Sequence, residues 1–213
     1  MKVALALESL QASPRARALA LGRRLARGGE LVAAVCLDDA PAAGPALAAR
    51  LGIREAYFVA DAALAKAGSR TRAQVLARLL TRVRADLVLV DAAADGGSGL
   101  FSASLAHHGE WAGLFRAPDV TRDAARPDAV EVTLDLAGTR KHLRVDLPAV
   151  VSVVGESAAL PALDPTLVRS RTFSLADLDL TIDDLVGNPI PGPAFVPAYH
   201  RPVVVTAIDD LLR

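Results

Sequence analysis

At residues 85–108 the chain reads ADLVLVDAAADGGSGLFSASLAHH, in which an apolar run enters a glycine-rich loop and then a stretch compatible with a helix. The apolar run is short and rich in leucine and valine, which is typical of a parallel strand buried on both faces. Three glycines and one serine follow within four residues, at 96–99. A strand that leads through such a loop into a helix is the repeating unit of an open α/β sheet.

Three further apolar runs of strand length precede this stretch: KVALALE at 2–8, ELVAAVCLD at 30–38 and EAYFVAD at 55–61. Helix-compatible stretches separate them. The first follows Ser13 and Pro14, which carry the signals of a helix start, and the third opens with Thr71 and Gln74, which predict a capping box. The alternation predicts a doubly wound α/β fold with a mostly parallel sheet.

The pattern changes after residue 116. Apolar and polar residues alternate at 129–146 on either side of Ala137-Gly138, which predicts a β-hairpin that adds antiparallel strands to the sheet. A buried run follows at 149–154. We therefore expect one domain over residues 1–180.

Residues 181–213 are predicted to form an extended C-terminal arm. Five prolines interrupt any regular element there: Pro189, Pro191, Pro193, Pro197 and Pro202. The arm also carries Phe195 and Tyr199, and such apolar side chains gain free energy by burial. We expect the arm to contact a partner subunit.

The composition excludes several classes of partner. Lys and Arg number 24, as do Asp and Glu, so the formal net charge is zero and no basic field attracts nucleic acid. No apolar run approaches the length of a membrane span. The single cysteine, Cys36, excludes an internal disulfide and fits a reducing cytoplasm. It also ends a predicted buried strand, where it is expected to pack as a small apolar residue.

The glycine loop has two interpretations. Gly96, Gly97 and Gly99 let backbone N–H groups approach an anion, and Ser98 is placed to cap the following helix, whose positive end favours a phosphate. Alternatively, the loop is only a turn between a strand and a helix. The adjacent pair His107 and His108 is expected to lie exposed at the helix end, because neighbouring helical residues do not converge on one metal ion.

The order and the sequences of these segments resemble those of the β subunit of electron transfer flavoproteins, over about residues 1 to 175. The most specific pieces are LGIREAYFV at 51–59, ADLVLVDAAADGGSG at 85–99 and DLPAVVSV at 146–153. The resemblance implies a heterodimer in which an α subunit holds most of the FAD, while this subunit holds a structural AMP. It further implies an electron carrier that collects electrons from a flavin-dependent dehydrogenase and makes or breaks no substrate bond.

The resemblance also assigns the residues that contact AMP. They lie at strand ends and in the glycine loop: Ala6, Cys36, Leu37, Val90, Asp95, Gly97, Ser98 and Gly99. Leu167 falls at the anchor leucine of the family's dehydrogenase-recognition loop. Two departures stand out: Leu100 replaces a glutamine of the family in a shortened loop, and ESLQASPRAR at 8–17 is a short turn in place of a longer segment that approaches the flavin.

Two other classes remain open at this stage. One is a stand-alone adenine-nucleotide-binding module of the universal-stress type, which shares the strand order but usually lacks the segment 116–154. The other is a scaffold subunit of a flavoprotein that has lost its nucleotide.

Overall fold

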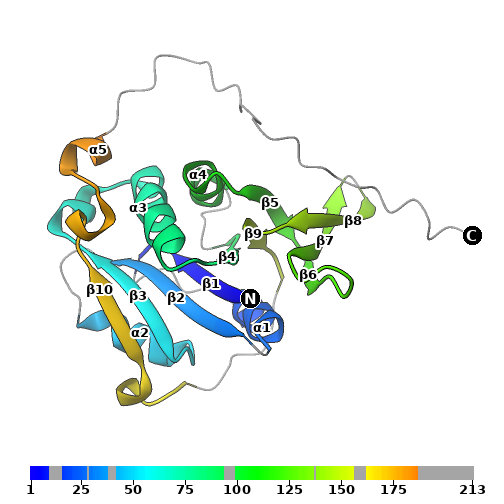
Figure 1. The fold of residues 1–213 in the computed structure, drawn as a ribbon, viewed down its shortest axis with the longest axis horizontal. Coiled ribbons are helices and arrows are strands. Elements are labelled where there is room, and N and C mark those ends of the chain that lie inside the picture. The colour runs from blue at the N-terminus through cyan, green and yellow to red at the C-terminus, as the bar shows by residue number, and fades with distance from the viewer. Residues whose placement is uncertain are drawn as a thin grey trace, which may run out of the picture.

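Seven parallel strands form the main sheet of the structure, a computed structural model that describes residues 1–9, 16–27, 29–37, 42–93, 99–136, 138–155 and 162–186. The strands are β1 (Lys2–Leu7), β2 (Glu30–Leu37), β3 (Glu55–Ala60), β4 (Leu87–Asp91), β5 (Ala112–Ala117), β9 (Ala149–Val153) and β10 (Arg169–Phe173). Their order is β10-β3-β2-β1-β4-β9-β5 (Figure 1). The predicted α/β fold is confirmed.

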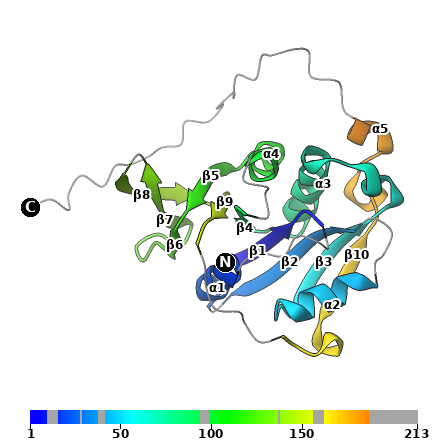
Figure 2. The ribbon, with the colours of Figure 1, turned by 180° about the vertical axis from the view of Figure 1, so that it is seen from behind.

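Helices cover both faces of this sheet (Figure 1, Figure 2). On one face lie α1 (Ala16–Leu25) and α2 (Ala43–Arg50), and on the other lie α3 (Ser69–Arg82) and α4 (Leu100–Gly109). In β1, Leu5 and Leu7 pack toward α1 and α2, whereas Ala4 and Ala6 pack toward α3 and α4. Because both sides of the strand are buried, its sequence is continuously apolar.

Shorter helical segments complete the described chain: η1 (Ala62–Lys66), η2 (Pro165–Leu167), η3 (Ala176–Leu178) and α5 (Ile182–Val186). Within the described ranges, no helix combines the length and the apolar character that crossing a membrane requires.

The predicted hairpin lies in a separate antiparallel sheet. It consists of β7 (Ala129–Leu136) and β8 (Thr139–Asp146), with β6 (Asp119–Arg122) beside β7. The expectation that the hairpin adds antiparallel strands to the main sheet is therefore wrong. Val130 and Val132 are fully buried, but Glu131 and Asp135 on the other face contact water, so the hairpin cannot lie between two layers of helices. Instead β9, buried throughout, enters the main sheet between β4 and β5.

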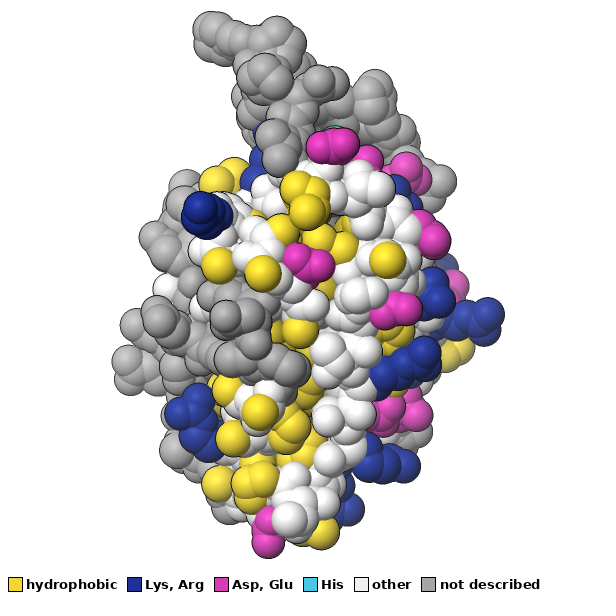
Figure 3. Space-filling model, turned by 90° about the vertical axis from the view of Figure 1, so that its left-hand side faces the viewer, with side chains coloured by type: hydrophobic (Ala, Val, Ile, Leu, Met, Phe, Trp, Pro, Cys, Tyr) yellow, Lys and Arg dark blue, Asp and Glu magenta, His cyan; other side chains and the backbone are white. Residues whose placement is uncertain are grey.

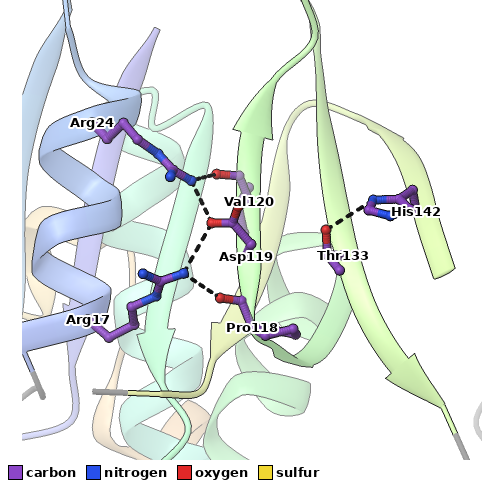
Figure 4. Close-up of polar contacts among 7 residues, drawn as sticks. All are labelled: Arg17, Arg24, Pro118, Asp119, Val120, Thr133 and His142. Atoms are coloured by element: carbon purple, nitrogen blue, oxygen red, sulfur yellow. Dashed lines mark hydrogen bonds and ion pairs between the residues drawn. The ribbon is translucent and has the colours of Figure 1, made fainter. Parts of the chain in front are cut away.

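Asp119 fastens the small sheet to α1 (Figure 4). Its Oδ1 lies 2.6 Å from Arg24 Nη2 and 3.3 Å from Arg17 Nη2. The same two nitrogens donate to the backbone carbonyls of Val120 at 2.6 Å and Pro118 at 2.8 Å. The two arginines lie about two helical turns apart, so they hold β6 along the length of α1.

The start of α3 differs from the predicted capping box. Gly68 is the N-cap residue, so Thr71 and Gln74 lie inside the helix. Their side chains instead donate to the backbone carbonyls of α5: Thr71 Oγ1 to Leu185 at 3.4 Å, and Gln74 Nε2 to Asp184 at 3.5 Å. Both residues therefore hold α5 against α3. The predicted start of the first helix, at Ser13 and Pro14, lies outside the described residues.

β10 is one of three strands, with β5 and β6, that the apolar pattern did not predict. Four of its five residues are exposed, and only Phe173 is buried. It pairs in parallel with β3, so that Arg169 lies opposite Glu55 and Phe173 opposite Val59. A strand at the edge of a sheet tolerates polar residues, because one of its sides needs no neighbouring strand.

The predicted C-terminal arm begins with described residues. Thr181 caps α5, because its Oγ1 accepts from the Asp184 N–H at 3.3 Å, and its own backbone N–H donates to Asp184 Oδ2 at 2.7 Å. The five prolines, Phe195 and Tyr199 lie outside the described residues. Contact of the arm with a partner subunit stays a prediction.

Candidate functional site

The carboxyl ends of β1 and β4 lie side by side at the switch point of the fold. From β1 the chain builds β2 and β3 on one side, and it then returns through α3 to place β4 on the other side of β1. The helices on either side of this point lie on opposite faces of the sheet, which is the arrangement that predicts a ligand crevice outside the strand ends of an open α/β sheet. Ligands of open α/β sheets bind in this crevice.

Four of the residues assigned to nucleotide binding lie on the strands at this edge. Ala6, Cys36 and Val90 belong to the core that faces α3 and α4, whereas Leu37 belongs to the core that faces α1 and α2. Each is at most 2% exposed. The structure therefore brings three of the four onto one face, and the side chain of Leu37 lies on the other. Their contact with a ligand stays a prediction.

Gly99 is the described residue of the glycine loop, and it precedes α4 at the same edge. Its φ is +71° and its ψ is 5°, a left-handed conformation that favours glycine. A Cβ added there would meet no atom within 4 Å. The glycine is therefore required by the backbone conformation and not by close packing.

The remaining loop residues, Asp95, Gly97 and Ser98, lie outside the described residues. The N-cap position of α4 is nevertheless defined. Gly99 occupies it, and the predicted capping by Ser98 falls on a residue outside the described ranges. Ser102 Oγ donates to the Gly99 carbonyl at 3.2 Å within the first turn.

A buried arginine on α3, which was not predicted from the sequence, hydrogen-bonds to backbone carbonyls near this edge of the sheet. Arg72 is 7% exposed, and its guanidinium donates to the backbone carbonyls of Glu8 at 3.1 Å, Leu64 at 2.6 Å and Ala67 at 3.0 Å. Cys36 Sγ lies 3.7 Å from the Arg72 carbonyl. The guanidinium thus joins the end of β1 to η1, and it brings a positive charge to this edge. Arginine is rarely buried, so no sequence signal indicated this role.

Two buried polar side chains lie on the neighbouring strands. Asp91, at the end of β4, is 3% exposed, and its Oδ1 accepts from the Ala93 N–H at 2.8 Å. Ser152 on β9 accepts from the Arg116 N–H at 2.9 Å, where β5 bends with a φ of +63°. Asp91 could have been predicted as a site residue, because it is an acidic residue at the end of an apolar run in the sequence.

The two histidines of α4 differ in their surroundings. His107 is exposed as expected, but His108 is half-buried with its Nε2 shielded from water. Burial, followed by the neighbouring His107, Arg70 and Arg78, lowers the pKa of His108 from an ordinary 6.5 to about 4. His108 is therefore neutral at pH 7. Among the described residues, no group of three potential ligands forms a metal site.

Leu167 lies far from the switch point, at the end of η2. Asp164 caps this turn by accepting from the Thr166 N–H at 2.9 Å. The hydrogen bonds that Thr166 donates to Asp164 hold the pKa of this carboxyl below its ordinary value. The Leu167 side chain is not buried by this arrangement and is 58% exposed. It is thus available to another protein, and its role in docking stays a prediction.

The chain has the fold of an open parallel α/β sheet, a class in which ligands bind at a switch point of the sheet. A family model for the electron transfer flavoprotein domain matches residues 13–174, and the chain belongs to this family. No curated protein matches the chain significantly.

Proposed function

We propose that this chain is the β subunit of a heterodimeric electron transfer flavoprotein, with a structural AMP of its own and FAD held mainly by the α subunit. The heterodimer carries electrons from a flavin-dependent dehydrogenase to a respiratory-chain acceptor, and this chain performs no bond-making chemistry. The observation that carries the proposal is the left-handed Gly99, which starts α4 at the switch point between β1 and β4. Membership of the electron transfer flavoprotein family supports a role in flavin-dependent electron transfer.

The described residues fit the phosphate of a nucleotide. The first N–H groups of a helix and its dipole favour an anion, and α4 begins at this edge. Open space beside Gly99 allows a ligand to approach the backbone closely. The Arg72 guanidinium adds positive charge to the same edge. In this proposal Gly97, Ser98 and Gly99 hold the phosphate.

The same edge suits the ribose and the base. A carboxylate near the switch point accepts hydrogen bonds from ribose hydroxyls in related folds, and Glu8 and Asp91 follow or end the two strands there. Asp95 is the loop residue proposed for the same role. The adenine is proposed to lie over the ends of β1, β2 and β4. Because Ala6, Cys36, Leu37 and Val90 are buried, these residues would define the floor of the site with little exposed side-chain surface.

The FAD of the partner subunit supplies the electron uptake and release when it is bound. We expect this chain to contact the flavin ring less than related subunits do, because its segment 8–17 is short. The arm at 181–213 is proposed to contact the α subunit and bury Phe195 and Tyr199. Leu167 is proposed to anchor the dehydrogenase. We place the heterodimer in the cytoplasm.

The family match favours this function over a universal-stress module. The small sheet of β6, β7 and β8 belongs to the segment that such modules usually lack. A nucleotide-free scaffold subunit shares the fold, so a ligand measurement is needed to separate it from the proposed function.

Co-expression with a flavoprotein α subunit from the same source tests the heterodimer. The two chains should copurify at equal stoichiometry and show the absorption spectrum of a bound flavin. Expressed alone, this chain should self-associate, because the apolar residues of the arm lack their partner. A soluble monomer that binds no α subunit would contradict the proposal.

A further inference from the structure

Arg116 has a left-handed backbone within a strand. The described residues other than glycine that have a positive φ are Arg84, Glu110, Arg116 and Asp179. Arg84 follows the end of α3, and Glu110 and Asp179 are the C-cap residues of α4 and η3, where a left-handed residue is an ordinary helix ending. Arg116 differs, because it lies in β5, with a φ of +63°. Its backbone conformation favours glycine, so a long side chain there is held under strain.

A β-bulge holds Arg116 in this conformation. The register between β5 and β9 shifts in this strand, so that Phe115 and Arg116 together lie opposite Ser152. Ser152 is 2% exposed, and its hydroxyl accepts a hydrogen bond from the Arg116 N–H at 2.9 Å. The other residues of β9 are apolar, so Ser152 is the side chain of this strand that can fix the bulge. Both bulge residues have exposed side chains, and Phe115 is 37% exposed.

The bulge lies on an edge of the main sheet (Figure 1). β5 pairs with β9, and no described strand lies on its other side. A bulge and a charged side chain both hinder the addition of a further strand to an edge. Such protection serves an edge that faces water. We therefore expect Phe115 and Arg116 to stay accessible after a permanent subunit has bound.

The two exposed side chains fit a protein surface of a particular chemistry. Aromatic and arginine side chains are enriched among the residues that contribute most to protein contacts. The Arg116 guanidinium forms no ion pair with a described residue, so its charge is available to a carboxylate of another protein. A second copy of this chain cannot supply that carboxylate from its own β5, because the sequence AGLFRA has no acidic residue.

We propose that Phe115 and Arg116 dock the respiratory-chain acceptor of the heterodimer, through a surface that presents a carboxylate beside an apolar side chain. The inference rests on the proposed function, in which the heterodimer has two electron-transfer partners. Leu167, the anchor proposed for the dehydrogenase, precedes β10 at the opposite end of the sheet. Figure 3 shows that side of the molecule, with hydrophobic side chains gathered on it. The two partners therefore bind this chain at opposite ends of its sheet.

The test measures the two electron transfers of the purified heterodimer separately. Isolated membranes from the same source supply the acceptor, and the dehydrogenase from that source that reduces the heterodimer most rapidly supplies the electrons. Arg116→Gly removes the guanidinium and keeps the bulge, because glycine adopts a left-handed backbone without strain. Phe115→Ala removes the ring. The matched control is Arg84→Gly, at another exposed left-handed arginine. Oxidation by ferrocenium, a small oxidant that needs no docking surface, checks the flavin.

In oxidation by the membranes, KM for the heterodimer should rise about tenfold in Arg116→Gly and about threefold in Phe115→Ala, with kcat unchanged. Reduction by the dehydrogenase and oxidation by ferrocenium should not change in either variant, and Arg84→Gly should match the unaltered protein. Unchanged KM values in both test variants would overturn the inference. Slower reduction by the dehydrogenase would assign the bulge to that partner, and loss of the α subunit would assign it to the heterodimer interface; either result would also overturn it. Variants that hold FAD and AMP and pass electrons to the membranes normally would leave the proposed function intact.

Discussion

The Arg72 guanidinium donates a 3.1 Å hydrogen bond to the backbone carbonyl of Glu8, which joins the first turn of α3 to the residue after β1. Ser69 strengthens this connection, because its hydroxyl donates to Glu8 Oε1 at 2.7 Å. The end of β1 is thus fixed from α3 as well as by its neighbouring strands. This end belongs to the edge of the sheet at which we propose that the nucleotide binds.

Replacing Arg72 by methionine should destabilise the protein by about 2 to 4 kcal/mol, because the buried carbonyls of Glu8, Leu64 and Ala67 would lose their donor. Arg78→Met, at an exposed position of the same helix, is the matched control and should change stability by less than about 0.5 kcal/mol. Urea unfolding measures both. Equal stability of the two variants would show that the three hydrogen bonds contribute nothing.

Two left-handed glycines allow a matched test of the loop before α4. Gly99 has a φ of +71° and Gly138 a φ of +83°, and a Cβ at either position would meet no atom within 4 Å. Alanine at each position should therefore cost a similar 1 to 2 kcal/mol, roughly, from backbone strain alone. Only Gly99→Ala should weaken AMP binding, because Gly138 lies in the β7–β8 turn. Equal AMP affinity in both variants, measured by calorimetry, would exclude Gly99 from the site.

The central strands could be predicted from the sequence, because burial on both faces makes each of them a continuous run of apolar residues. The apolar patterns could not predict β10, whose exposed residues follow no apolar period, or Arg72, whose burial depends on carbonyls far apart in the sequence. The capping box was misassigned because Thr71 and Gln74 have the right spacing but serve tertiary contacts with α5. The strand ends were predicted as a site, but Leu37 faces away from Ala6 because successive residues of a strand alternate.

Acid should destabilise the fold partly through His108. Burial lowers its pKa from 6.5 to about 4, so the folded state binds the proton less readily than the unfolded state. This contribution to stability is complete above about pH 6.5 and is lost as the pH falls toward about 4. His108→Gln should therefore show a smaller loss of unfolding free energy between these pH values than the unaltered protein. His142→Gln, at an exposed histidine of β8, should behave like the unaltered protein. An identical pH dependence of all three proteins would refute the assignment.

Leu167→Ala tests the proposed anchor directly. A leucine that enters a partner pocket contributes on the order of 1 to 3 kcal/mol to binding, so reduction at subsaturating heterodimer should slow by roughly 5- to 150-fold. The flavin spectrum should not change, because the 58% exposed side chain supports no part of the fold. Phe115→Ala, at a 37% exposed residue of β5, is the control. A rate equal to that of the control would contradict the assignment of Leu167 as the anchor.

The nucleotide content of the heterodimer tests the central claim most directly. The complex is purified without added nucleotide and denatured, and the released small molecules are separated by chromatography and quantified against protein. The account predicts one equivalent of AMP for each copy of this chain, beside the FAD of the partner, despite Leu100 at the start of α4. Release of FAD without AMP or any other nucleotide would contradict it, and would show that the loop before α4 is only a turn in a scaffold subunit.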